Sequence, residues 1–259
     1  MPTIDLNADL GESFGPWTMG DDKSLLSIVT SANVACGFHG GDPSVMFETA
    51  KTAKANGVAI GAHPGFQDLQ GFGRRVIRGS TMAEIEYMTA YQIGALQALA
   101  KAAGHEVTHV KPHGALGNLC NDEDDFALAI GRAIKSVDPR LVYVVMPARN
   151  SERAADKLGL PMVREVFADR TYDDHGQLTS RKLAGSVIND PAEATAHVLR
   201  MIEGRAITSV NGKKIPVEID TICVHGDKPS AVAQARAVRK AIETAGFTLK
   251  PFASPARTR

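Results

Sequence analysis

Seven short apolar segments recur along the chain, and they constrain the fold more than any other feature. Each is a near-continuous apolar run rather than an alternating one, which is typical of parallel strands covered on both faces. Segments with helical patterns separate them. The repetition of strand, helix and strand predicts an α/β fold, either a parallel βα barrel or a doubly wound sheet. The predicted strands are residues 3–6, 31–35, 58–62, 107–111, 141–146, 162–167 and 219–224.

Capping signals mark where the intervening helices begin and end. Thr81 and Glu84 form a capping-box pattern that predicts a long helix ending near Gly104. One segment departs from this rhythm, because Asn211-Gly212 between two apolar stretches predicts a β-hairpin with a type I′ turn. We interpret the hairpin as an insertion in a single domain spanning residues 1–259, since no linker or low-complexity segment divides the chain. Further helices are predicted at residues 44–55, 122–136 and 150–158, from residue 190 onward, and at 230–245.

Composition excludes several classes of protein. The 259 residues include 29 Lys and Arg and 29 Asp and Glu, so the absence of net charge argues against nucleic acid or an anionic membrane as a partner. The three cysteines form no CxxC pair, which indicates a reducing compartment. The N-terminus resembles no signal peptide, and no apolar run reaches membrane-spanning length. We therefore expect a cytoplasmic protein.

Polar side chains follow most of the predicted strands. Asp9 comes after the first strand, His39 after the second, His63 after the third, His113 after the fourth and His225 after the last. The carboxyl ends of parallel strands meet at one face of a βα barrel, where active sites are built. The sequence therefore predicts one cavity that gathers these side chains, and an enzyme.

Two chemistries remain open for the centre of this cavity. Two neutral imidazoles and one carboxylate, here His63, His113 and Asp9, are a ligand set for a divalent metal with open positions. The same three groups can act without a metal as acid, base and orienting groups. The sequence does not decide between these interpretations.

Neighbouring polar residues have both functional and structural interpretations. Asn7 and Glu12 flank Asp9 and either take part in the chemistry or hydrogen-bond within a loop. Asp42 either lines the site or caps the helix that follows it. Lys111 either holds a carboxylate or an oxyanion, or forms an ion pair.

Two arginine-bearing segments and the last strand end complete the candidates. Arg74 and Arg75 follow a glycine-rich stretch that either closes over an anionic substrate or is a solvated loop. Arg170 ends the sixth strand, and Asp227 follows His225 at the end of the last. The chain contains no P-loop, no GxGxxG after a strand, no GxSxG elbow and no zinc-finger spacing. Nothing in it by itself indicates nucleotide binding.

Several long sequence blocks together resemble the LamB/YcsF family, which is the family of the 5-oxoprolinase A subunit. The resemblance covers essentially the whole chain. The blocks are DLNADLGESFG (5–15), ANVACGFHGGD (32–42), GAHPGF (61–66), GFGRR (71–75), VKPHGAL (110–116), EVFADR (165–170) and CVHGD (223–227).

The resemblance implies a fold, an activity and partners. The fold is the seven-stranded, TIM-like βα barrel of the glycoside hydrolase/deacetylase superfamily. The activity is the ATP-dependent opening of the lactam of 5-oxo-L-proline to L-glutamate, together with subunits B and C. Some relatives in that superfamily hold a metal with an Asp and two His, which makes Asp9, His63 and His113 the candidate ligands here. Because a P-loop is missing, we expect Mg-ATP to bind mainly on the partner subunits.

Two alternatives to the lactam-opening activity remain: a metal-dependent deacetylase acting on an N-acetylated sugar or a similar amide, and a non-catalytic metabolite-binding barrel. The density of ionisable groups at the strand ends argues against the second. The predicted catalytic residues are Asp9, Glu12, His39, His63, Lys111 and His113, and the predicted substrate-binding residues are Asn7, Asp42, Arg75, Arg170, His225 and Asp227.

Overall fold

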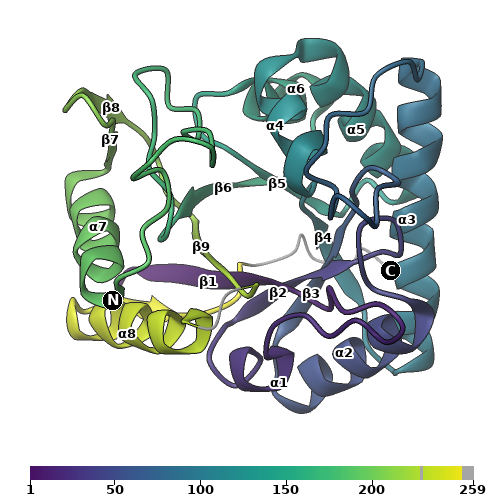
Figure 1. Ribbon diagram of the computed structural model, residues 1–259, viewed down its shortest axis with the longest axis horizontal. Helices are drawn as coiled ribbons and strands as arrows, with labels where there is room; N and C mark the ends of the chain where they lie inside the picture. Colours follow the sequence, from purple (N-terminus) through teal and green to yellow (C-terminus); the bar gives the residue numbers. More distant parts are fainter. Residues whose placement is uncertain (228–229, 253–259) are drawn as a thin grey trace.

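A closed ring of parallel strands forms the centre of the molecule, and helices surround it (Figure 1). The computed structural model describes residues 1–227 and 230–252, and within them seven strands make up the ring. Pairing of the last strand with the first closes it, so the predicted βα barrel is confirmed. In ring order the strands are β1 (Thr3–Leu10), β2 (Ser31–Ala35), β3 (Ala59–His63), β4 (Val107–Val110), β5 (Val142–Val145), β6 (Met162–Phe167) and β9 (Thr221–His225).

The first strand is longer than predicted, and this changes the position of two candidate residues. β1 continues through Leu10, so Asn7 and Asp9 lie within the strand rather than after it. Side chains alternate along a strand, and Asp5, Asn7 and Asp9 point to the barrel interior, where they bond to side chains of other strands. The apolar residues between them belong to the core outside the barrel wall. The prediction ends the strand too early because a buried strand is expected to be apolar throughout.

Helices pack around the outside of the barrel and follow the predicted capping signals in most places. The capping box of Thr81 and Glu84 is formed, and Gly159 ends its helix in the left-handed conformation. The predicted helix at 122–136 begins at Asp124, and another helix that was not predicted precedes it. The helices are α1 (Asp22–Leu25), α2 (Pro43–Ala55), α3 (Met82–Ala102), α4 (Gly114–Asp122), α5 (Asp124–Val137), α6 (Asn150–Leu158), α7 (Pro191–Gly204) and α8 (Ala231–Thr244).

The predicted hairpin is present, but its turn differs from the prediction. Strands β7 (Ala206–Thr208) and β8 (Lys214–Pro216) pair antiparallel, away from the barrel (Figure 1). A type I′ turn needs positive φ at two central residues, whereas here Gly212 has a φ of 83° and Asn211 has no positive φ. The hydroxyl of Ser209 accepts hydrogen bonds from the backbone N–H groups of Asn211 and Lys213, and this stabilises a longer loop.

Two further features complete the fold. A short strand, β10 (Thr248–Leu249), pairs with the start of β1 outside the ring. Among the described residues, no helix combines the length and the apolar character needed to cross a membrane.

Candidate active site

A cavity of about 440 Å³ opens at the carboxyl ends of the barrel strands. Its size falls in the range of small-molecule sites. The structure thus brings together side chains that are far apart in the sequence, as an active site at this face of a barrel requires. Among the predicted residues, those that line it are Asp9, Glu12, His63, Lys111, His113, Arg170, His225 and Asp227.

A buried lysine joined to two carboxylates forms one side of the cavity. Lys111 Nζ lies 2.9 Å from Asp9 Oδ1 and 2.8 Å from Glu165 Oε1, and it also contacts Cys223 Sγ at 3.0 Å. Burial alone would lower the pKa of Lys111, but Asp9, Cys223 and Glu165 raise it well above its usual value. Lys111 is therefore a cation already neutralised by its neighbours, which corresponds to the ion-pair interpretation.

The charge of Asp9 is fixed by the same neighbours. Burial alone would raise the pKa of this carboxyl, but His63 and Lys111 lower it well below its usual value. Its Oδ1 accepts hydrogen bonds from Lys111 and from Asn33 Nδ2, the latter at 2.9 Å. Its Oδ2 lies 3.4 Å from His63 Nε2 and 4.0 Å from His225 Nε2. Asp9 is thus ionised, with one oxygen bound and the other directed at histidines.

Asparagine side chains hold this arrangement from inside the barrel. Asn33 Nδ2 donates to Asn7 Oδ1 at 2.7 Å as well as to Asp9. Asn7 Nδ2 in turn donates to Glu165 Oε1 at 3.0 Å and to Thr221 Oγ1 at 2.7 Å. Asn7 does not line the cavity, so the structure places it as a support of the acidic groups rather than as a substrate contact.

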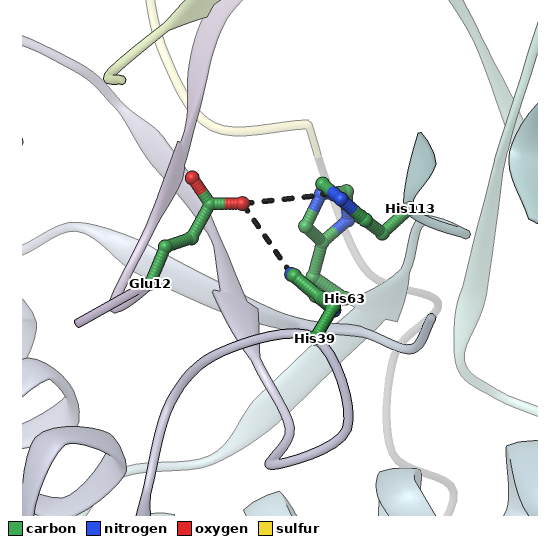
Figure 2. A group of neighbouring side chains, drawn as sticks. All are labelled: Glu12, His39, His63 and His113. Atoms are coloured by element: carbon green, nitrogen blue, oxygen red, sulfur yellow. Dashed lines mark hydrogen bonds and ion pairs between the residues drawn. The ribbon is translucent and has the colours of Figure 1, made fainter. Parts of the chain in front are cut away.

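Three histidines and a glutamate meet in one cluster (Figure 2), and His63 of this cluster lies next to Asp9. His63 Nδ1 lies 2.6 Å from the carbonyl oxygen of Lys111, and His113 Nε2 lies 2.8 Å from that of Phe72. A carbonyl can only accept, so we assign the ring protons to these two nitrogens. The other two nitrogens, His63 Nε2 and His113 Nδ1, then present lone pairs to each other at 3.0 Å. Two facing lone pairs repel each other unless a proton or a cation lies between them.

The remaining two members of the cluster also have buried atoms without hydrogen-bond partners among the described residues. His39 stacks on His113 with ring centroids 3.6 Å apart, and both of its ring nitrogens have no hydrogen-bond partner among the described residues. Glu12 Oε1 is similarly unpaired, and lies 3.4 Å from His39 Nε2 and 3.6 Å from His113 Nδ1. Burial lowers the pKa values of His39 and His113, so both rings are neutral.

This donor set fits a divalent metal ion. Imidazole nitrogens and carboxylate oxygens are ordinary metal ligands, and the donor atoms of these four residues lie within 4.8 Å of one another. The set differs from the predicted Asp9, His63 and His113, because the converging donor atoms come from Glu12, His39, His63 and His113, whereas Asp9 converges with Cys223 and His225 in a second group. Glu12 and His39 take its place. The sequence marked both as candidates but gave no sign that their atoms converge.

Next to Asp9, on the neighbouring strand β9, a carboxylate holds a histidine. His225 Nδ1 lies 2.7 Å from Asp169 Oδ1, which orients the ring and leaves Nε2 directed toward Asp9. Arg74 pairs with Asp227 at 2.7 Å at the rim. Burial together with the nearby Arg181 lowers the pKa of Arg170 to about 10.

Besides Asn7, two other predicted substrate-binding residues lie outside the cavity lining. Asp42 caps α2 by accepting from the backbone N–H groups of Ser44 and Val45, so its structural interpretation is the correct one. Arg75 bonds to Asp68 beside a separate surface depression, whereas its neighbour Arg74 lines the cavity. Adjacent residues of a tight loop point in different directions, and the sequence alone does not show which of them faces inward.

The barrel and its strand-end cavity define this chain as a TIM-type βα barrel with the layout of an enzyme. The catalytic domain of a peptidoglycan N-acetylglucosamine deacetylase from Eubacterium rectale shares the fold at a TM-score of 0.52, with 10% identity over 99% of this chain and 93% of that one. So low an identity shows the fold alone.

The chain belongs to the LamB/YcsF family, whose model matches residues 4–257. A relative from Rhodopseudomonas palustris (strain CGA009), named as the A subunit of 5-oxoprolinase, is 57% identical over 96% of this chain and 98% of its own length. One of the same name from Gluconobacter oxydans is 53% identical over 96% and 97%. The crystal structure of a lactam utilization protein from Thermus thermophilus matches with a TM-score of 0.90 and 46% identity, over 96% of this chain and 100% of that one.

Proposed function

We propose that this chain is the A subunit of a 5-oxoprolinase, which opens the lactam ring of 5-oxo-L-proline to L-glutamate. The observation that carries the proposal is the cavity in which an ionised Asp9 faces His63 and the Asp169–His225 pair. The names of relatives that are more than half identical over nearly the whole chain support the same activity.

The geometry supplies the groups that lactam opening needs. Water must lose a proton as it attacks the carbonyl carbon, and the ring nitrogen must gain one as it leaves. Asp9 Oδ2 is free to accept a hydrogen bond from the attacking water and orient it, because Lys111 and Asn33 occupy Oδ1. His225, oriented by Asp169, directs its Nε2 toward the same space and can carry the proton to the leaving nitrogen.

We further propose that Glu12, His39, His63 and His113 hold one divalent ion. The support is the unpaired buried atoms of Glu12 and His39 and the facing lone pairs of His63 and His113. Such an ion would polarise the lactam carbonyl or lower the pKa of a bound water.

Metal analysis tests this ligand set. Protein purified without chelators should contain about one equivalent of a divalent metal. His39→Ala should lose most of it, because a site that loses one of its four protein ligands binds its ion weakly. His175→Ala removes an exposed histidine and should keep the parent's metal content. If the parent protein contains no metal and remains active in the presence of strong chelators, the cluster acts as a metal-free acid–base group.

We assign ATP binding mainly to partner subunits B and C. An amide is a poor electrophile with a poor leaving group, so the reaction needs ATP for activation, yet the chain contains no P-loop. The division of labour follows: the partners would bind Mg-ATP, and this chain would carry out hydrolysis.

An assay in which each subunit is omitted in turn tests the proposed function. This chain alone should release little or no glutamate from 5-oxo-L-proline, whereas the mixture with subunits B and C and Mg-ATP should release glutamate and ADP. Full activity from B and C in the absence of this chain would refute the assignment. Release of acetate from an N-acetylated sugar by the chain alone would favour the deacetylase alternative.

A further inference from the structure

We propose that Arg181 is the residue that binds the substrate carboxylate, an inference that rests on the proposed function. 5-Oxo-L-proline is a small ring with one carboxylate, and a planar guanidinium matches a carboxylate in charge and geometry. Arg181 lies on the long segment between β6 and α7 and lines the cavity. Nothing in the local sequence marks it as a site residue.

Elimination among the cations of the cavity leads to Arg181. Within the described residues, the lysines and arginines that line the cavity are Arg74, Lys111, Arg170, Arg181 and Lys182. Lys111 is neutralised by Asp9 and Glu165, and Arg74 is paired with Asp227. Each would have to break an existing ion pair before it could bind a substrate anion, which costs part of the binding free energy.

Arg170 is committed to the loop that carries Arg181. Its guanidinium donates to the carbonyl oxygens of Thr179 at 2.6 Å and Ser186 at 3.3 Å. These bonds, with one from the backbone N–H of Ile188 to the carbonyl of Asp169, fold the segment back on itself. Arg170 is thus a support of the loop rather than its anion-binding group. Lys182 is exposed to solvent, where an ion pair contributes little.

Arg181 is half-buried and has no hydrogen bond or ion pair with any described residue, although it lies at a wall that also carries Asp9 and Asp227. Burial and the nearby Arg74 lower its pKa, so an anion placed there would relieve an unfavourable environment. A guanidinium remains protonated at neutral pH in any case.

This position orients the substrate. A carboxylate held at the loop directs the lactam carbonyl toward the barrel side of the cavity, where Asp9, His113 and His225 lie. The subsite would select lactams that carry a carboxylate beside the ring nitrogen over uncharged lactams of the same size.

Kinetics of the assembly with subunits B and C and Mg-ATP test the proposal. The substrates are 5-oxo-L-proline and its uncharged carboxamide, and the variants are Arg181→Gln, Arg181→Lys and the matched control Arg236→Gln, an exposed arginine on α8. Loss of one charge-assisted hydrogen-bonding group should raise KM for 5-oxo-L-proline roughly 10- to 100-fold in Arg181→Gln. Arg181→Lys should recover part of this, and Arg236→Gln should match the parent.

The carboxamide separates carboxylate binding from a general effect on the loop. Its turnover should be the same in the parent and in Arg181→Gln, because it has no charge to lose. An unchanged KM for 5-oxo-L-proline, or an equal loss for both substrates, would overturn the role of Arg181 while the proposed function stands. A parent assembly that releases no glutamate would overturn the proposed function and this inference with it.

Discussion

Replacement of Lys111 by methionine should lower the free energy of unfolding by about 3–5 kcal/mol, the range measured when one partner of a buried ion pair is removed. Lys111, Asp9 and Glu165 are all buried, with 5%, 6% and 3% of their surfaces exposed. Methionine keeps most of the volume of the lysine side chain but leaves two carboxylates without their shared cation. Urea unfolding of the purified chain, followed by circular dichroism, measures the change.

Two further variants make this result specific. Lys157→Met removes an exposed lysine from α6 and should change stability by less than about 0.5 kcal/mol. Addition of Glu165→Gln to Lys111→Met removes one of the two uncompensated charges and should restore part of the stability. If Lys111→Met unfolds at the same urea concentration as the parent, the ion-paired centre does not stabilise the barrel.

The strand pattern could be predicted because the barrel wall is apolar on the side that faces the helices. Residues such as Leu6, Val34 and Ile60 are fully buried and mark their strands without ambiguity. Long helices with clear caps, such as α3, are predictable for the same local reasons. α4 carries no such signal, because its N-cap residue, His113, forms no side-chain capping bond and glycines lie near its start.

The polar interior of the barrel could not be predicted from local sequence. Asp5 lies within β1 at 1% exposure, and hydroxyl groups of Ser31 and Thr221 satisfy it from β2 and β9. Burial raises its pKa to about 6 despite these donors. Such partners come from strands that are distant in the chain, so the sequence gives no direct sign that a polar residue inside a strand is satisfied.

The sequence predicts which residues come together at the candidate site, but it does not predict how their atoms are arranged there. Strand-end histidines meet at one face by the topology of a barrel, which is why the sequence points to His63, His113 and His225. Which carboxylate belongs to the histidine cluster depends on where the side chains converge in three dimensions: Glu12 converges on the histidines, whereas Asp9 groups with Cys223 and His225. Arg181 escapes prediction because its loop has no periodic pattern, and its place at the cavity is set by bonds from Arg170.

Substitution of His113 by alanine should reduce glutamate release by the assembly with B and C at least about 10²-fold, the usual scale for loss of an acid–base group. The ring of His113 lies at the centre of the cluster, in contact with His63, stacked on His39 and 3.6 Å from Glu12. Its removal takes one donor nitrogen from the cluster and leaves a space that water can enter. The measurement is glutamate release at saturating Mg-ATP.

The fold should survive this change, which makes the activity loss interpretable. His113 is the N-cap residue of α4, but its side chain forms no capping bond, so alanine leaves the helix start intact. The lost bond to the carbonyl of Phe72 should cost only about 1–3 kcal/mol, within the stability of most domains. His175→Ala, at an exposed position outside the cavity lining, should keep the parent's rate. A folded His113→Ala chain that supports parental glutamate release would show that the cluster has no part in the reaction, whichever metal or proton it holds.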